Sequence, residues 1–188
     1  MKLYIFGGSF DPPHLGHLEI ALKCLSHCDK FIFIPAKHAP QKAHIPYGTP
    51  TNRVQMLQEM IYDKSKIEIE HYELNSDKPN YSIYTIKYLK LKYPDAEITM
   101  VIGADQMTKF HTWYKWEEIL KEVRILCFNR NNIKVDLSNY SNVKFIEDFN
   151  MDIASDKIRE SYAFGEENGL GYLHPMVITY IKKTGLYR

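Results

Sequence analysis

The chain has 188 residues, of which 45% are hydrophobic and 25% charged, the proportions of an ordinary globular protein. A chain of this length can bury a sizeable core, so it needs neither disulfides nor a structural metal to fold. The formal net charge of +1 excludes a nucleic-acid binder that acts through bulk positive charge. Since no apolar run approaches the roughly 18–20 residues of a membrane span, we expect neither nucleic acid nor membrane as a partner.

The three cysteines, Cys24, Cys28 and Cys127, are an odd number without the Cys-x-x-Cys spacing of a metal or redox site. Such cysteines are typical of buried or free thiols in a reducing compartment. The first residues lack the apolar stretch and cleavage site of a secretory signal peptide. We therefore expect a cytoplasmic protein.

Short β-type runs alternate along the chain with segments of helical periodicity. The expected strands are Lys2–Phe6, Phe31–Ile34, Lys66–Glu70, Glu97–Ile102, Val123–Phe128 and Val143–Ile146. The expected helices between them are Gly16–Leu25, Thr51–Tyr62, Ser82–Leu91 and Trp116–Lys121. This alternation predicts an α/β fold, a Rossmann-like three-layer α/β/α arrangement with a parallel sheet of about five to six strands.

The tail differs from the rest, because Ser155–Tyr162 and Pro175–Lys183 read as two helices with no strand between them. We expect one domain, 1–188, in which 151–188 form a helical C-terminal extension. Ligands of parallel sheets bind beyond the carboxyl ends of the strands. The residues that follow each strand are therefore the candidates for chemistry.

The clearest motif follows the first expected strand and reads Gly7-Gly8-Ser9-Phe10-Asp11-Pro12-Pro13-His14-Leu15-Gly16-His17. A glycine pair lets the main chain turn tightly and lets a ligand approach it. His14 and His17 lie three residues apart at the start of an expected helix, so both imidazoles can point to one side. Two imidazoles beside a helix N-terminus indicate an anion site; the alternative is a capped loop with two surface histidines.

This motif matches neither the Gly-x-Gly-x-x-Gly dinucleotide fingerprint nor a Walker A loop. His14 and His17 could instead be zinc ligands, but zinc needs a third or fourth ligand. No later His-x-x-His or cysteine pair supplies one. We therefore expect no metal ion held by the protein's own side chains.

Polar side chains also follow later strands. In the loop after the second strand, Lys37 or Lys42 could reach a phosphate as a point charge, or lie on an exposed basic loop. Asp105 follows the fourth strand and suits either a ribose hydroxyl or the start of a helix. Ser155 at an expected N-cap and Arg159 one helical turn later can converge on an anion; the alternative is an ordinary cap and a solvated arginine.

An aromatic cluster spans residues 110–116 and includes Trp113 and Tyr114. It can serve as a stacking platform for a flat ring or as core packing for the next helix. Adjacent residues of a regular helix do not share a face, which favours one of the two facing a pocket.

Together these motifs resemble those of the bacterial nicotinate-nucleotide adenylyltransferases, a family of the (T/H)xGH nucleotidyltransferase superfamily. The first loop has the superfamily's His-x-Gly-His form. The later family motifs are matched by Pro40-Gln41-Lys42, Gly103-Ala104-Asp105, Thr112-Trp113-Tyr114 and Ser155 to Arg159, and the segment from Tyr172 to Tyr187 resembles the family's C-terminal helix. The resemblance covers nearly the whole chain.

The resemblance implies transfer of AMP from ATP to nicotinate mononucleotide, giving deamido-NAD and pyrophosphate. It implies His14, His17, Lys42 and Arg159 as catalytic residues. The implied ATP-binding residues are Gly7, Gly8, Ser9, Phe10, His14, His17, Gly103, Asp105, Ser155, Ile158 and Arg159. The implied nicotinate mononucleotide-binding residues are Gly8, Ser9, Lys42, Thr85, Trp113 and Tyr114. Mg²⁺ is expected to arrive with ATP and to have few or no direct protein ligands.

The implied acceptor is the acid rather than the amide. Trp113 could stack on the pyridine ring, and main-chain N–H groups near Tyr114 and Thr85, with the Thr85 hydroxyl, could hold the carboxylate. An amide there would leave buried groups unpaired, so we expect preference for the acid. Three departures from the family pattern are Gln41 for histidine, Tyr84 for an acidic residue, and Asn129-Arg130-Asn131 for Arg-Pro-Gly.

Two hypotheses remain as alternatives to the adenylyltransferase. One keeps the superfamily and changes the acceptor, to nicotinamide mononucleotide or another phosphate, or transfers a cytidylyl group. The other is a nucleotide-binding protein without catalysis. A homo-oligomer and closure of the Pro35–Tyr47 loop over substrate are left open by the sequence.

Overall fold

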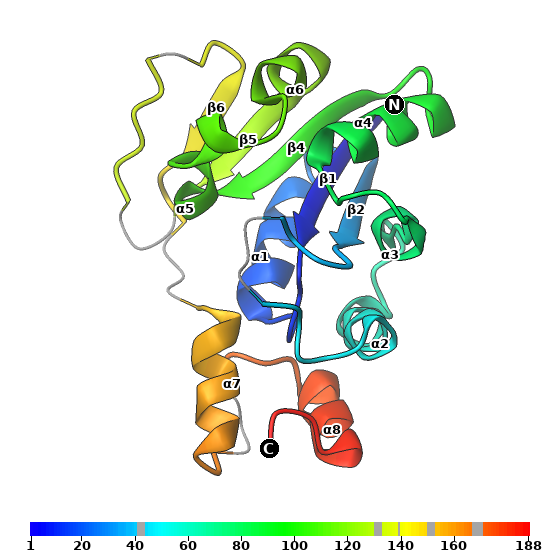
Figure 1. Cartoon of the computed structure of the whole chain (residues 1–188), viewed down its shortest axis with the longest axis vertical. Coiled ribbons are helices and arrows are strands. Elements are labelled where there is room, and N and C mark those ends of the chain that lie inside the picture. Colours follow the sequence, from blue (N-terminus) through cyan, green and yellow to red (C-terminus); the bar gives the residue numbers. More distant parts are fainter. Residues whose placement is uncertain (41–43, 130–132, 139, 150–152, 167–170) are drawn as a thin grey trace.

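Six parallel strands form the centre of the molecule (Figure 1). The computed structural model describes residues 1–40, 44–129, 133–138, 140–149, 153–166 and 171–188. The strands are β1 (Lys2–Gly8), β2 (Lys30–Pro35), β3 (Ile67–Ile69), β4 (Glu97–Gly103), β5 (Arg124–Phe128) and β6 (Val143–Ile146). Their order in the sheet is β3-β2-β1-β4-β5-β6, and every neighbouring pair is parallel. The predicted parallel sheet is confirmed.

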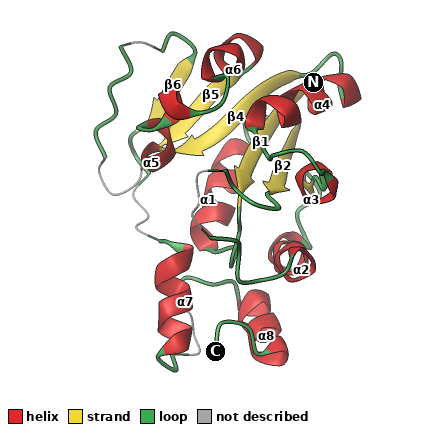
Figure 2. Ribbon diagram, viewed as in Figure 1, coloured by secondary structure: helices red, strands yellow, loops and turns green. Residues whose placement is uncertain are grey.

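Helices lie on both sides of this sheet and complete the expected three-layer, Rossmann-like α/β fold (Figure 2). They are α1 (Leu15–Cys24), α2 (Pro50–Ile61), α3 (Tyr72–Asn75), α4 (Ser82–Lys92), α5 (Ala104–Met107), α6 (Trp116–Glu122), α7 (Ser155–Ala163) and α8 (Pro175–Thr184), with a short 3₁₀ helix, η1 (Phe110–Thr112). In Figure 1 the two tail helices, α7 and α8, lie below the sheet, and α8 packs against α2. The division into one domain with an extension at 151–188 stays a prediction.

The core has two halves, one on each face of the sheet. Because successive strand side chains point to opposite faces, Leu3 and Ile5 enter one apolar cluster and Phe6 enters the other. The first cluster joins β1, β2, β4 and β5 to α4 and α6, and the second joins the sheet to α1, α2, α7 and α8. Burial on both faces explains why the strands read as continuous apolar runs in the sequence.

Local sequence determines several helix boundaries. Thr49 accepts a hydrogen bond from the main-chain N–H of Asn52 at 3.2 Å, and Pro50 is the first residue of α2. At the other end of the chain α8 stops at Gly185, whose φ of 69° lies in the left-handed region that glycine adopts readily. These are ordinary start and stop signals, and the predicted and observed helices agree there within two residues.

Three short elements have no counterpart among the predicted ones: α3, α5 and η1. Each is three or four residues long, so no apolar periodicity can mark it. The strand expected at Lys66–Glu70 is shorter in the structure, Ile67–Ile69, because only these residues pair with β2.

Candidate functional site

The carboxyl ends of β1, β2, β4 and β5 meet at one edge of the sheet. Gly8 lies beside Pro35 in the register of β1 and β2, and Gly103 lies beside Phe128 in that of β4 and β5. The loops that follow these strands therefore converge, as expected for a parallel sheet. Gly7 and Gly8 are the last residues of β1, so the predicted ligand loop starts at this edge.

The loop after β1 is buried over most of its length. Ser9, Asp11 and His14 are all buried polar residues. Phe10 has a φ of 50°, and its ring lies in the core against Phe6 and Phe33. A Cβ atom added at Gly8 would lie 3.0 Å from Cζ of Phe10, so the glycine makes room for that ring. The Phe10 side chain therefore supports the loop from below.

His14 and His17 form a stacked pair at the start of α1. Their ring centroids are 3.6 Å apart with 22° between the planes, and Nδ1 of His17 accepts a hydrogen bond from the main-chain N–H of His14 at 3.1 Å. Acceptance at Nδ1 assigns the proton of a neutral His17 to Nε2. A Cβ atom at Gly16 would lie 3.1 Å from the His14 ring, so the spacing His-x-Gly-His fits the packing of the two imidazoles.

Asp11 connects the loop after β1 to two distant segments, one at residues 47–48 and the other at Tyr187. Its carboxylate accepts hydrogen bonds from the N–H of Tyr47 (2.7 Å), the N–H of Gly48 (2.9 Å) and the hydroxyl of Tyr187 (2.7 Å). Only 3% of Asp11 is exposed. A Cβ atom at Gly48 would lie 2.8 Å from Oδ1 of Asp11, which explains a glycine at that position. Burial, with the nearby Asp11 carboxylate, raises the pKa of Tyr187 well above its usual value.

Arg53 completes this buried network from α2. It is 1% exposed; its Nε donates to the carbonyl of Gly48 at 3.1 Å and its Nη1 donates to the carbonyl of Ser9 at 2.6 Å. Burial lowers the pKa of Arg53, and the charge of Asp11 opposes that effect. The sequence analysis missed this residue. Its signal was the position of Arg53 at the head of the buried row Met56, Leu57, Met60 and Ile61.

Helix α7 brings two of the predicted phosphate ligands to the same loop. The Ser155 hydroxyl donates to the carbonyl of Pro12 at 2.9 Å, and Nη1 of Arg159 donates to the carbonyl of Asp11 at 2.6 Å. Cζ of Arg159 also lies 4.8 Å from the ring centroid of Tyr47. The prediction of Ser155 as an N-cap is wrong by one position, because Ala154 is the N-cap and the Ser155 hydroxyl binds across to the loop. The Ile158 side chain is fully buried in the core.

Asp105 lies at the carboxyl end of β4, in the first turn of α5. Its Oδ2 accepts a hydrogen bond from Nε2 of Gln106 at 3.1 Å. A Cβ atom at Gly103 would lie 2.5 Å from Oδ1 of Asp105, so the main chain and the carboxylate approach closely there. Gly103 itself, not Asp105, is the N-cap residue of α5.

Three buried polar atoms have no hydrogen-bond partner within the described residues: Oγ of Ser9, Oδ1 of Asn129 and Nε1 of Trp113. Ser9 follows β1 and Asn129 follows β5, so two of the three flank the edge directly. Buried polar groups in native proteins are nearly always paired. Unpaired donors and acceptors that gather at the carboxyl edge point to a polar ligand there.

The residues predicted to hold the acceptor differ in their exposure and in the groups that their side chains contact. Trp113 packs on Phe110 with ring centroids 5.3 Å apart, whereas Tyr114 is 43% exposed and stacks on Tyr81 at 4.6 Å. Thr85 is only 2% exposed, and its hydroxyl donates to Oε1 of Glu73 at 2.7 Å. In this structure the Thr85 hydroxyl is therefore directed into the protein, toward a carboxyl group that the sequence analysis did not identify.

Glu73 is a buried carboxyl group on α3. Burial raises its pKa to about 7, and the hydrogen bond from Thr85 opposes part of that rise. The main chain of Glu73 is also held, because Nδ2 of Asn80 donates a hydrogen bond to the Glu73 carbonyl at 3.0 Å. Glu73 is therefore a group whose protonation is coupled to folding in the neutral range.

Lys42 and Gln41, and likewise Arg130 and Asn131, lie outside the described residues. Lys37 lies on the surface, with Nζ 3.4 Å from the carbonyl of Ser76 and 3.8 Å from Oδ1 of Asp77. The described part of the chain contains no cluster of three His, Cys, Asp or Glu residues suited to a metal ion. It also contains no helix long and apolar enough to cross a membrane.

Comparison with known proteins agrees with this geometry. Residues 5–161 match the family model described as cytidylyltransferase-like. A probable nicotinate-nucleotide adenylyltransferase of Methylacidiphilum infernorum is 34% identical, over 99% of this chain and 92% of its own length. The nicotinate-nucleotide adenylyltransferase of Bacillus subtilis is 32% identical, over 99% and 98%. The fold matches that of the Plasmodium falciparum nicotinic acid mononucleotide adenylyltransferase complexed with NaAD, with a TM-score of 0.78, 22% identity and coverage of 99% and 97%.

The Asp11 network predicts a graded loss of stability. Tyr187→Phe removes one buried hydrogen bond and is expected to lower the free energy of unfolding by about 1 kcal/mol. Asp11→Ala leaves the Arg53 charge and two main-chain N–H groups uncompensated, and is expected to cost about 3–5 kcal/mol. Urea unfolding measures both. Tyr62→Phe, on an exposed tyrosine, is the control, and a Tyr187→Phe variant as stable as that control would contradict the network.

The raised pKa of Glu73 predicts a pH dependence of stability. Between the ordinary glutamate pKa of about 4.5 and the folded value of about 7, the folded state holds a proton that the unfolded state has lost. This group therefore contributes a free energy of unfolding that falls as pH rises through that window, by about 3 kcal/mol in total.

Glu73→Gln removes this dependence while keeping the shape of the side chain. The free energy of unfolding of the variant minus that of the original protein is expected to be about 3 kcal/mol larger at pH 8 than at pH 5, as measured by urea unfolding. Glu19→Gln, on the exposed side of α1, is the matched control and should show no such difference. An equal effect of Glu73→Gln at both pH values would show that Glu73 does not titrate in this range.

Proposed function

The chain belongs to the cytidylyltransferase-like family and, within it, to the nicotinate-nucleotide adenylyltransferases, and from this membership we propose that it transfers the adenylyl group of ATP to nicotinate mononucleotide. The products are deamido-NAD and pyrophosphate, a step of NAD biosynthesis. The observation that carries the proposal is the stacked His14–His17 pair on the loop that follows Gly7 and Gly8. The same loop holds the buried Oγ of Ser9, which has no hydrogen-bond partner among the described residues.

The reaction needs positioning and charge stabilisation rather than a general base. An oxygen of the acceptor phosphate, ionised at neutral pH, attacks the α-phosphorus of MgATP. A new P–O bond forms, the bond to the β-phosphate oxygen breaks, and its electron pair leaves with pyrophosphate. No proton has to be removed from the nucleophile. The protein's task is to hold two anions in line and to stabilise the charge that builds up on the phosphates.

His14 and His17 are suited to that task. The bond from the His14 N–H to Nδ1 of His17 fixes the ring, so its Nε2–H is the proposed donor to a phosphate oxygen. Both rings stand at the N-terminus of α1, where the helix dipole also favours negative charge. Gly7, Gly8 and Ser9 are proposed to surround the nucleotide with main chain and with the Ser9 hydroxyl.

Ser155 and Arg159 are proposed to act on the leaving phosphates. A guanidinium has five N–H donors, and the bond to the Asp11 carbonyl uses one of them. Arg159 thus stands beside the histidine loop while retaining donors for an anion. Lys42 is proposed as a further point charge for the phosphates, and Asp105 with Gly103 as contacts to ribose at the junction of the two nucleotides.

The preference for the acid acceptor is proposed to depend on donors near Trp113 and Tyr114. The indole N–H of Trp113 is buried and has no partner among the described residues, so it is available to a carboxylate oxygen. The face of the same ring could stack on the pyridine ring. The Thr85 hydroxyl already donates to Glu73, so it can assist only after that bond rearranges. Donors of this kind suit a carboxylate and leave an amide's NH₂ group unpaired.

We further infer a cytoplasmic location from the cysteines. Cys24, Cys28 and Cys127 are free and buried, and burial raises the pKa of Cys24 and Cys127 to about 12. Thiols in this state are inert packing groups, which suits a reducing compartment.

The proposed function is tested by pyrophosphate release from MgATP with nicotinate mononucleotide or with nicotinamide mononucleotide. We expect rapid release with the acid and slow release with the amide. Release with the amide alone would overturn the proposed acceptor. ATP binding without release from either would overturn the reaction and favour a non-catalytic nucleotide-binding protein.

Replacing His17 tests the role of the histidine pair. His17→Ala removes one preorganised donor and is expected to lower kcat about 10²–10³-fold. The melting temperature of the variant is measured beside kcat, because the imidazole also binds the His14 N–H. Leu15→Met, on the same turn of α1, is a control that leaves both imidazoles in place. Unchanged turnover in His17→Ala would remove the histidine pair from the mechanism.

Replacing Trp113 separates a substrate contact from a packing role. Trp113→Ala is expected to raise KM for nicotinate mononucleotide at least about tenfold, with a smaller effect on KM for ATP. Trp113→Phe keeps an aromatic face and loses the indole N–H, so it divides stacking from hydrogen bonding. Equal weakening of both substrates by Trp113→Ala would mean that the indole only packs on Phe110.

A further inference from the structure

Tyr47 is an exposed aromatic residue beside the candidate site. It lies in the segment between β2 and α2, and 68% of it is exposed. Its ring nevertheless has defined neighbours. Cζ of Arg159 lies 4.8 Å from the ring centroid, within the roughly 6 Å of a cation–π interaction, and the ring of His44 lies edge-on at 5.6 Å. An exposed ring therefore covers the guanidinium to which the proposed function assigns the leaving phosphates.

Asp11 binds both partners of this contact. Oδ2 of its carboxylate accepts the main-chain N–H of Tyr47 at 2.7 Å, and its carbonyl accepts Nη1 of Arg159 at 2.6 Å. Asp11 is itself buried, in a loop that Arg53 binds through the carbonyl of Ser9. Asp11, Tyr47 and Arg159 therefore form a closed set of three contacts, in which each residue touches the other two.

This closed set restricts the orientation of the guanidinium. A guanidinium held by one hydrogen bond can rotate about that bond, whereas a ring against its face limits the rotation. The N–H groups that Asp11 does not use lie in the guanidinium plane, which is the plane of two-point binding to a phosphate. The Tyr47 ring therefore favours the orientation in which Arg159 can bind a phosphate by two hydrogen bonds.

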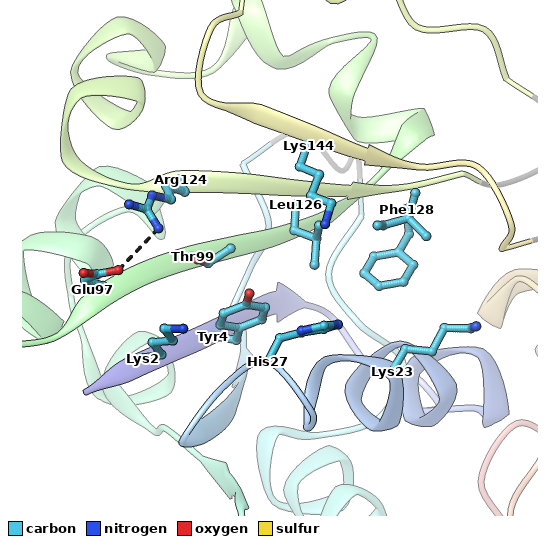
Figure 3. Close-up of a pocket in the computed structure, with 11 residues that line it drawn as sticks. Lys2, Tyr4, Lys23, His27, Glu97, Thr99, Arg124, Leu126, Phe128 and Lys144 are labelled. Carbon is cyan, nitrogen blue, oxygen red and sulfur yellow. Dashed lines mark hydrogen bonds and ion pairs between the residues drawn. The ribbon is translucent and has the colours of Figure 1, made fainter.

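Arg124 has a different environment. It is the first residue of β5, at the amino end of the strand, whereas the loops of the candidate site follow the carboxyl ends. Figure 3 shows Arg124 facing Glu97, with Nη1 and Oε2 3.3 Å apart, so a carboxylate offsets part of its charge. Within the described ranges no acidic side chain lies at ion-pair distance from Arg159. A carbonyl and a neutral ring orient Arg159 instead, and its charge stays available to an anion.

We propose that Tyr47 is a positioning residue, whose ring orients the Arg159 guanidinium toward the phosphates that leave as pyrophosphate. This inference rests on the proposed function, which assigns those phosphates to Arg159. The ring makes the contact, since the Tyr47 hydroxyl has no hydrogen-bond partner in the described part of the chain. The main-chain bond to Asp11 does not depend on the side chain, so replacing the side chain tests the ring alone.

Binding of magnesium pyrophosphate, measured by isothermal titration calorimetry, tests the Arg159 site without turnover. Tyr47→Leu is expected to raise Kd for pyrophosphate about three- to fivefold and to lower kcat by a similar factor, the scale of one exposed cation–π contact. KM for nicotinate mononucleotide should stay close to its original value. Tyr47→Phe keeps the aromatic face and should restore both Kd and kcat.

A double-mutant cycle shows whether the ring acts through the guanidinium. Arg159→Ala removes charged hydrogen bonds and is expected to raise Kd for pyrophosphate at least about tenfold. Adding Tyr47→Leu to Arg159→Ala should then change Kd little further, because the ring has no guanidinium left to orient. Two effects that multiply would show that the ring acts independently of Arg159 and would overturn the proposal.

Two matched controls use the same replacements elsewhere. Tyr62→Leu, on an exposed tyrosine at the end of α2, and Arg124→Ala, at the opposite edge of the sheet, should leave Kd and kcat unchanged. Circular dichroism and melting temperature establish that each variant is folded. An unchanged Kd in Tyr47→Leu beside a raised Kd in Arg159→Ala would overturn this inference alone. A failure of the proposed adenylyl transfer would appear in the pyrophosphate-release assay of the original protein and not in this binding assay.

Discussion

The geometry of the candidate site depends on one buried carboxylate. Asp11 accepts hydrogen bonds from two main-chain N–H groups at the start of the α2 region and from the hydroxyl of Tyr187. A buried charge is costly unless it is compensated, and here the compensation comes from two separate parts of the chain, the start of the α2 region and Tyr187. Arg53 balances the charge from α2 and binds the carbonyl of Ser9. Because each partner is itself held by the fold, the loop after β1 is fixed from several sides.

Contacts with the same loop also fix the position of α7. Ser155 and Arg159 reach the carbonyls of Pro12 and Asp11, so the helix that follows the sheet is attached to the loop that precedes α1. A cationic side chain next to the histidine pair is thus positioned by main-chain contacts rather than by another charge. Among the described residues no acidic side chain lies within ion-pair distance of Arg159, so its charge stays available to the phosphate that we propose it binds.

Sequence reasoning succeeded where local pattern decides structure. The apolar runs of β1, β2 and β4 are buried on both faces, and the loop with its glycines and two histidines follows β1 as predicted. It failed where a residue distant in the sequence determines the contacts of a side chain. Arg53 reads as an ordinary helix residue until Ser9 and Gly48 are known to lie beside it, and the direction of the Thr85 hydroxyl depends on Glu73, twelve residues earlier. Ser155 was expected to cap its own helix, but its hydroxyl binds the carbonyl of a residue 143 positions earlier.

The bond between Asp11 and Tyr187 spans 176 positions. Closing so large a loop has an entropic cost, which must be met before the contact can repay it. β1 pairs with β2 and β4 through far shorter separations, so the sheet can assemble while its glycine-rich loop still lacks one of its supports. The loop after β1 therefore gains one of its supports only once the segment around Tyr187 is in place. A partly folded molecule can already hold a native sheet while the loop that would bind phosphate is still incomplete.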